Sequence, residues 1–362
     1  MLDNILSRLK LRADKGPVLG VDIGTISVKV AEVIPQAGKL RLSNYGLVEI
    51  GGYLERSNSV IQTSSLKMDE AETAGLLKEA VHRMGTRTKQ AIGVVPSFAS
   101  FTSLIELPPM TAQELEQAIP YQARSLVPLP ISEVAIDWIN VGSYEDDNGN
   151  TKQQILLISV PNDQIASYQS VFKRAGLKLK YLEIEGLSLA RSLTYGSTGN
   201  ILIIDIGAFT TTIVIADGGS LRFVGQTDFS GNSLTQALSK GLGITPRRAE
   251  ALKKQRGLSG MTGEYGLSTL MLPFVDVILN EVRRVRDVFE GKHKKKIDKI
   301  LLSGGGGDLI GFSEYVQKQL GIPTEKGDPF RNVSYPPESA PLVRNIASRF
   351  SVAVGAGAKD TS

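Results

Sequence analysis

One strand–turn–strand pattern occurs twice in this chain, and the second copy follows 183 residues after the first. Residues 20–25 read Gly-Val-Asp-Ile-Gly-Thr, and residues 204–208 read Ile-Asp-Ile-Gly-Ala. In both copies an apolar run precedes the Asp-x-Gly sequence, and small or hydroxyl-bearing residues and a second apolar run follow it. A third run repeats as well, at 38–42 and 219–223. The pattern predicts two copies of one small β-hairpin with glycine in its tight turn.

Each predicted turn carries one aspartate, Asp22 in the first copy and Asp205 in the second. A duplicated fold would set the two carboxylates opposite each other, together with two sets of bare backbone N–H groups. Carboxylates are ligands of Mg²⁺, and exposed N–H groups bind phosphate oxygens. We therefore expect the two turns to hold a magnesium-bound polyphosphate between them.

Length and composition limit the other classes of function. A chain of 362 residues is long for one core, so two lobes are expected. The absence of cysteine excludes disulfides, thiolate metal sites and cysteine nucleophiles. The two histidines, His82 and His293, are expected at the surface, His82 on a helix and His293 in a basic loop. A net charge of +4 does not indicate nucleic-acid binding, and no apolar run approaches 18 residues, so a cytosolic protein is expected.

The region between the two hairpins predicts a separate α+β unit. Residues 100–183 show the order β-α-β-β-α-β. Thr111 and Glu114 have the spacing of a capping box at the start of a helix that Pro120 would kink. The acidic stretch 145–150 is interpreted as a hairpin turn, because it lacks the distal glutamate of a calcium loop.

The second half of the chain is mostly helical until a glycine run. One helix is expected from Pro246 to Gly257, and a long amphipathic helix at 268–290, with its regular part beginning near Pro273. The basic stretch 292–296 is expected as a solvated loop. A strand at 297–302 then leads into four glycines and a further helix. Small residues line a last helix at 343–358, where they permit close approach to another backbone.

The order of these motifs resembles that of the superfamily of actin, DnaK-type chaperones and sugar kinases. The matching segments are phosphate-1 at 19–29, a connecting helix at 185–192, phosphate-2 at 202–212, the adenosine motif at 301–309 and a second connecting helix at 351–358. The resemblance implies an α/β, actin-like (ribonuclease H-like) two-lobed ATPase fold with an inserted α+β subdomain. The implied parts are an amphipathic segment at 1–15; a first lobe of 16–99, 184–198 and 343–362; the insert (SHS2-like) at 100–183; a second lobe of 199–230 and 295–342; and its helical subdomain at 231–294.

The same resemblance assigns site residues for ATP or ADP with Mg²⁺. Asp22 and Asp205 fall to the metal, mostly through water. The residues assigned to the phosphates are Gly24, Thr25, Ser27, Gly207, Thr210 and Thr211, and those assigned to the adenosine motif are Gly304, Gly305, Gly306 and Gly307. Lys29 is either a further phosphate ligand or a solvent-facing strand lysine. Glu250 and Lys253 match a nucleoside-contacting helix of bacterial actin-like proteins, the alternative being a surface ion pair.

Within this superfamily, an insert after phosphate-1 resembles FtsA and the PilM family of type IV pilus assembly proteins. The stretches 107–110, 117–123 and 127–131 resemble the PilM family specifically, and the last residues, 359–362, are not expected to form the membrane helix usual in FtsA. The implied role is a component of the pilus inner-membrane platform. It would bind the cytoplasmic N-terminal peptide of PilN in a groove beside the insert and lie at the cytoplasmic face of the membrane through that partner.

Two alternatives stay open: an FtsA-like cytoskeletal protein and a small-molecule kinase on the same core. No residue stands out that must activate an attacking water, so ATP hydrolysis is expected to be slow or absent. Lobe closure on nucleotide is expected to alter the peptide groove if both depend on one hinge.

Overall fold

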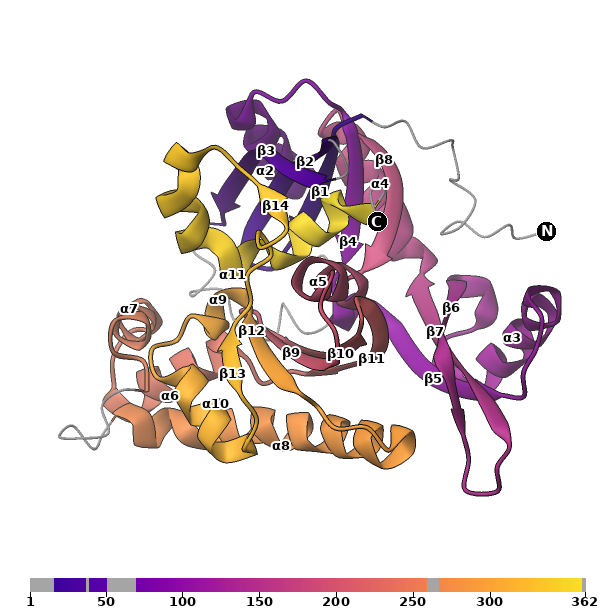
Figure 1. The fold of residues 1–362 in the computed structure, drawn as a ribbon. Helices are drawn as coiled ribbons and strands as arrows, with labels where there is room; N and C mark the ends of the chain where they lie inside the picture. The colour runs from indigo at the N-terminus through magenta and orange to yellow at the C-terminus, as the bar shows by residue number, and fades with distance from the viewer. Residues whose placement is uncertain (1–15, 37–38, 51–69, 259–266, 360–362) are drawn as a thin grey trace.

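The computed structural model describes residues 16–36, 39–50, 70–258 and 267–359. Their strands form three sheets, and Figure 1 shows two of them stacked with helices between and around them while the third projects to one side. The predicted amphipathic segment at 1–15 lies outside the described residues. Within the described ranges, no helix combines the length and the apolar character needed to cross a bilayer.

The first sheet contains the first hairpin. Its strand order is β14-β3-β2-β1-β4-β8, with the following bounds: β1 Val18–Ile23, β2 Ser27–Gln36, β3 Lys39–Glu49, β4 Gln90–Val95, β8 Lys178–Ile184 and β14 Val333–Ser334. Strand β1 is antiparallel to β2 and parallel to β4. On β2, Val28 and Val30 face the core of helix α2 (Glu70–Met84), whereas Ala31 and Val33 face helix α11 (Ala340–Gly357). Helices therefore cover both faces of this sheet.

The second sheet repeats the first in strand order and direction. Its order is β11-β10-β9-β12-β13, with these bounds: β9 Asn200–Ile206, β10 Thr211–Asp217, β11 Ser220–Thr227, β12 Lys299–Ser303 and β13 Thr324–Lys326. Here β9 is antiparallel to β10 and parallel to β12, as β1 is to β2 and β4. The two predicted hairpins are thus confirmed, and each forms the centre of its own sheet.

Two helices fill the space between these sheets, as Figure 1 shows. They are α5 (Glu185–Thr194) and α11, which contact each other and both sheets. A Cβ on Gly20 would lie 1.9 Å from the carbonyl oxygen of Ala353, and one on Gly355 would lie 2.0 Å from that of Ser188. The small residues of the last helix therefore serve the close backbone approach that the sequence predicts.

The third sheet belongs to the insert and has the order β5-β7-β6. Strands β5 (Phe101–Leu107), β6 (Val134–Glu145) and β7 (Thr151–Pro161) pack with helix α3 (Ala112–Leu126). Thr111 and Glu114 form the predicted capping box, and a tight turn joins β6 to β7 at 146–150.

The predicted end of the insert, residue 183, is wrong. Strand β8 pairs in parallel with β4 in the first sheet, and helix α4 (Asn162–Arg174) contacts α2. The α+β unit with its own core therefore ends at Pro161 rather than at 183. A strand pattern does not specify which sheet the strand joins, and here an open edge of the first sheet takes β8.

The helical block after the second hairpin differs from the prediction in two respects. Helices α6 (Gly231–Leu242), α7 (Pro246–Arg256) and α8 (Leu267–His293) bury side chains in one core with the second sheet, so 231–294 has no separate core among the described residues. Helix α8 begins at Leu267, within one residue of the predicted start, but it is already helical before Pro273, because Ser268 and Met271 are buried and tertiary packing outweighs the helix-breaking residue. Helix α10 (Phe312–Leu320) completes this core.

The basic stretch 292–296 is not simply a solvated loop. Lys292 and His293 are still part of α8, and Lys292 forms an ion pair with Glu106 of the insert. The ring of His293 packs against Phe289 and Tyr144, with centroid distances of 4.5 and 5.7 Å. The prediction that His293 lies in a surface loop is therefore wrong, because the helix extends far enough to meet the insert.

Candidate functional site

The two Asp-x-Gly turns have the same hydrogen bond. In the first turn (residues 22–27) the N–H of Gly24 donates to the carbonyl of Ser27 at 3.0 Å. In the second turn (residues 205–210) the N–H of Gly207 donates to the carbonyl of Thr210 at 2.9 Å. A Cβ on Gly207 would lie 2.9 Å from that carbonyl oxygen, so this turn requires glycine. The two copies therefore share backbone geometry as well as sequence.

Three carboxylates share the space between the turns. The pKa of Asp205 is raised to about 7 by burial first and then by the charges of Glu185 and Asp22, while the hydrogen bond of Ser303 and the charge of Lys29 oppose this shift. Burial also raises the pKa of Glu185, and the charge of Asp22 adds to this effect. Each of these acids contributes to the pKa of another, so the three carboxylates lie near one another in poorly screened space.

Glu185 begins α5 and is held from both sheets. Its Oε2 accepts hydrogen bonds from the Ser97 hydroxyl at 2.9 Å, from the Ser97 N–H at 3.4 Å and from the Thr212 hydroxyl at 2.8 Å. Sequence reasoning treated Glu185 only as the start of a connecting helix. The available signal was its position directly after parallel strand β8, since polar residues at the carboxyl ends of adjacent parallel strands gather at one edge.

Lys29 is part of this site rather than a solvent-facing strand residue. Its Nζ lies 2.7 Å from Oδ2 of Asp22, and both side chains are 15% exposed. Strand pairing explains the contact, because Asp22 and Lys29 are direct neighbours across β1 and β2. In the second hairpin Thr212 occupies the equivalent position opposite Asp205. Among the described residues, Lys29 thus offsets the charge of Asp22, while the raised pKa values of Glu185 and Asp205 mean that a divalent cation bound there would favour their ionised forms.

The hydroxyl residues of the turns differ in their surroundings. Thr25 and Thr210 are half-buried, whereas Ser27 is buried. Thr211 is buried, and its hydroxyl donates to the carbonyl of Phe229 at 2.7 Å. This hydroxyl already has a backbone partner, so its assignment to a phosphate has less support than those of Thr25 and Thr210.

Glu250 and Lys253 form a buried pair beside the second turn. Their charged atoms are 2.6 Å apart, and the side chains are 13% and 9% exposed. Lys253 also donates to the carbonyl of Gly231 at 2.8 Å, and the N–H of Gly231 donates to the carbonyl of Gly207 at 3.0 Å. Burial raises the pKa of Glu250, but the charge and hydrogen bond of Lys253 outweigh it and give a net lowering. The i,i+3 ion pair of the alternative is therefore present, but it is buried rather than at the surface.

The four glycines Gly304–Gly307 form one short helical turn, α9, after β12. Gly304 has a φ of +74°, and a Cβ on it would lie 2.4 Å from the carbonyl oxygen of Ile206. A Cβ on Gly306 would lie 2.3 Å from Cγ2 of Ile206, whereas one on Gly305 would meet only Arg349 Cδ at 4.0 Å. Gly304 and Gly306 are thus required by packing on the end of β9, while Gly305 presents bare backbone to open space.

The donor set fits a hydrated magnesium ion rather than a closed metal cage. Among the described residues, no group of three His, Asp or Glu side chains is arranged to hold a metal ion directly. Mg²⁺ usually keeps several waters and binds through one or two carboxylates and the phosphates of its nucleotide. Asp22 and Asp205 would supply those carboxylates, and the ion would lower the repulsion among the three acids.

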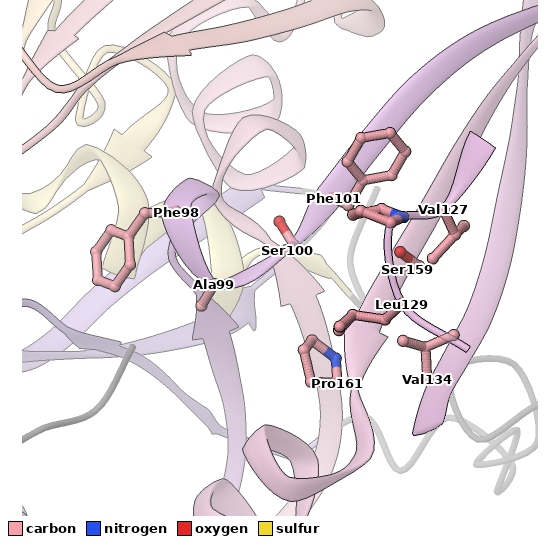
Figure 2. Close-up of a pocket in the computed structure, with 10 residues that line it drawn as sticks. Phe98, Ala99, Ser100, Phe101, Val127, Leu129, Val134, Ser159 and Pro161 are labelled. Atoms are coloured by element: carbon pink, nitrogen blue, oxygen red, sulfur yellow. The ribbon is translucent and has the colours of Figure 1, made fainter. Parts of the chain in front are cut away.

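A separate apolar pocket lies where the insert joins the first sheet (Figure 2). Its volume is about 190 Å³. It is lined by Phe98, Ala99, Ser100, Phe101, Val127, Pro128, Leu129, Val134, Ser159 and Pro161. In Figure 2, Leu129, Val134 and Pro161 gather on one side and Phe98 lies on the other. Both chain connections of the insert, at 98–101 and 159–161, therefore contribute to the wall of this pocket.

Comparison with solved structures identifies the fold. The PilM-PilN type IV pilus biogenesis complex contains a chain with a TM-score of 0.78 and 21% identity, covering 96% of this chain and 99% of that one. EutJ from Carboxydothermus hydrogenoformans gives a TM-score of 0.53 at 18% identity, covering 94% and 88%. MreB5 of Spiroplasma citri bound to ADP gives 0.51 at 15% identity, covering 94% of each chain. The fold is the predicted α/β, actin-like ATPase fold.

Comparison with protein sequences gives the family. The cell division protein FtsA of Streptococcus pneumoniae is 22% identical over 358 residues, covering 86% of this chain and 75% of FtsA. FtsA of Neisseria meningitidis is 24% identical over 199 residues, about half of each protein. The model of the family "Type IV pilus assembly protein PilM" matches residues 20–359, almost the whole chain. The chain therefore belongs to the PilM family of type IV pilus assembly proteins, within the larger group of FtsA-like and actin-like proteins.

Proposed function

We propose that this chain is an ATP-binding component of the type IV pilus inner-membrane platform. It binds Mg-ATP or Mg-ADP between the two turns and the cytoplasmic N-terminal peptide of PilN in the pocket of Figure 2. The peptide brings it to the cytoplasmic face of the inner membrane. The observation that carries the proposal is the pair of turns with matching hydrogen bonds, with Asp22 held by Lys29 in one hairpin and Glu185 held by Thr212, the strand neighbour of Asp205, in the other.

The nucleotide part is supported by the surroundings of the turns. A divalent cation that binds beside Asp22 and Asp205 offsets the burial and relieves the mutual repulsion that raise the pKa of Asp205, and it carries the phosphates with it. Gly305 has no side chain and has open space beside it, although its neighbours pack on the end of β9. A flat ring can therefore lie against its backbone. The buried pair of Glu250 and Lys253 fixes the start of α6 against the second turn. One related structure, MreB5, carries ADP.

The peptide part is supported by the chemistry of the pocket. Its lining is mostly apolar, and Leu129 is 41% exposed at its edge. An exposed apolar hollow of this kind suits an apolar side chain of a short peptide. The related pilus structure is a complex with PilN. The pocket lies beside the insert, which supports this place for the peptide.

Peptide binding to matched leucine variants tests this proposal. The probe is a fluorescent synthetic peptide with the N-terminal cytoplasmic sequence of PilN from the same organism, followed by anisotropy. Leu129→Asp places a charge in the pocket and should weaken binding by about tenfold or more. Leu242→Asp is the control, because Leu242 is equally exposed, at 40%, but lies on α6 away from the pocket. Equal affinities in the two variants would contradict the proposed pocket.

A further inference from the structure

We propose that Ser97 is a positioning residue that couples the nucleotide site to the peptide pocket. The inference rests on the proposed function, since it needs Mg-nucleotide at the two turns and the peptide in the pocket. It adds the physical connection between the two sites, which is the single 3₁₀ turn η1 (Ser97–Ala99) after β4.

One end of this turn belongs to the nucleotide site. Ser97 is buried, and both its hydroxyl and its N–H donate to Oε2 of Glu185. The hydroxyl of Thr212, on the second sheet, lies 3.1 Å from the Ser97 hydroxyl and 2.8 Å from the same Glu185 oxygen. Ser97 follows β4 of the first sheet, yet it contacts helix α5 through Glu185 and strand β10 of the second sheet through Thr212, which pairs with Asp205.

The other end of the turn belongs to the peptide pocket. Phe98, Ala99, Ser100 and Phe101 follow Ser97 directly and line the pocket wall (Figure 2). The N–H of Ser100 and its hydroxyl both point to the carbonyl of Ser97 at 3.3 Å, and the N–H of Ala99 donates to the carbonyl of Pro96 at 2.9 Å. These short-range bonds make the segment stiff, so a displacement of Ser97 moves Phe98 and Ala99 with it.

Binding of a nucleotide changes the charges that hold Ser97. The pKa of Glu185 is raised by burial and by the charge of Asp22, so a cation bound near Asp22 alters the environment of this carboxylate. Because the oxygen of Glu185 is shared by Ser97 and Thr212, any shift of α5 or β10 stretches one of these bonds. Buried polar groups keep their hydrogen-bond partners, so Ser97 moves together with the carboxylate of Glu185. The turn then changes the wall of the pocket.

The test is the ratio of peptide dissociation constants without nucleotide and with saturating Mg-AMPPNP. It is measured with the labelled PilN N-terminal peptide on the full chain, and nucleotide affinity is measured separately by calorimetry. In the unaltered protein the ratio should differ from one by about fivefold or more, the usual lower range of coupling between sites. Ser97→Ala, measured at a nucleotide concentration that calorimetry shows to saturate this variant, should bring the ratio to within about twofold of one, because the hydroxyl link is lost.

Ser100→Ala is the matched control. It removes a hydroxyl from the same segment and from the pocket lining, but this hydroxyl does not contact Glu185. It should change the peptide affinity equally with and without nucleotide and keep the ratio of the unaltered protein. The coupling is overturned if Ser97→Ala keeps the ratio of the unaltered protein. It is also overturned if the unaltered protein binds both ligands and its ratio is one. Failure of the unaltered protein to bind either ligand refutes the proposed function instead.

Discussion

The hydroxyl of Thr212 donates to the carboxylate of Glu185 at 2.8 Å, and this contact joins the second sheet to the helix that connects the two halves of the molecule. Thr212 occupies, in the second hairpin, the position that Lys29 occupies in the first. The duplicated hairpins therefore differ at the position opposite the aspartate. One copy provides a cation for Asp22, and the other provides a neutral hydroxyl for Glu185.

Replacing Thr212 by valine should destabilise the protein. The variant Thr212→Val leaves a buried carboxylate with one donor fewer, and the loss of a hydrogen bond to a charged group costs about 1.5–3 kcal/mol of unfolding free energy. Denaturant unfolding measures this. Thr102→Val is the control, because Thr102 lies half-buried on β5 and its side chain forms no hydrogen bond with another of the described residues. Equal stabilities of the two variants would contradict a role for this contact.

Asp205 should make the nucleotide-free protein less stable as the pH rises. Its pKa is raised from 3.8 to about 7, mainly by burial, so between these values the unfolded chain has lost the proton while the folded chain keeps it. The unfolding free energy therefore falls from about pH 4 to pH 7 and levels off above. Asp205→Asn removes this effect and should be more stable than the unaltered protein above pH 7, by about 2–4 kcal/mol. Thermal melts of both proteins from pH 4.5 to 8.5 check it, and a constant difference would contradict it.

The contact between the connecting helices should not tolerate a single methyl group. Gly355→Ala places a Cβ 2.0 Å from the carbonyl oxygen of Ser188, so the helices must move apart. Overpacking of this kind costs about 1–3 kcal/mol or more. Gly75→Ala is the opposite case, because Gly75 lies exposed in α2 with open space around it and alanine favours a helix by about 1 kcal/mol. We expect a lower melting temperature for the first variant and a higher one for the second.

The ion pair of Lys292 and Glu106 should fasten the insert to the second sheet's core. Burial raises the pKa of Glu106, but hydrogen bonds from Lys292 and Tyr144 and the charge of Lys292 give a net lowering. A double-mutant cycle with Lys292→Met and Glu106→Gln should yield a coupling energy of about 0.5–1.5 kcal/mol that weakens in high salt. Additive effects of the two substitutions would show that the contact does not hold the insert.

The sequence predicted the local features of this fold better than its long-range contacts. The two hairpins, the capping box of Thr111 and the helix end at Gly257 were predictable because short-range hydrogen bonds and backbone conformations determine them. The end of the insert was not, because β8 joins the first sheet by pairing with a strand 88 residues earlier (Gln90 with Lys178). The position of Lys292 against the insert depends in the same way on the whole tertiary structure.

The site was predictable only where a motif marked it. Asp22 and Asp205 were found from the repeat, and in the structure, besides burial, the charge of Asp22 contributes to the raised pKa of Asp205. Glu185, Ser97 and Thr212 were not assigned to the site, because they come from three distant segments whose contacts depend on the tertiary structure. For Lys29, sequence reasoning left two roles open, and the pairing register of β1 and β2 excludes the solvent-facing one.

Calorimetric titration of Mg-ATP into the protein and its aspartate variants tests the central claim most directly. We predict that Asp22→Asn and Asp205→Asn each weaken binding by about tenfold or more and reduce its dependence on Mg²⁺, since each removes a carboxylate from the cation. Asp217 lies at the other end of the second hairpin and forms an ion pair with Arg222, so Asp217→Asn should bind Mg-ATP as tightly as the unaltered protein does. Unaltered Mg-ATP affinity in both Asp22→Asn and Asp205→Asn would contradict a nucleotide held between the two turns.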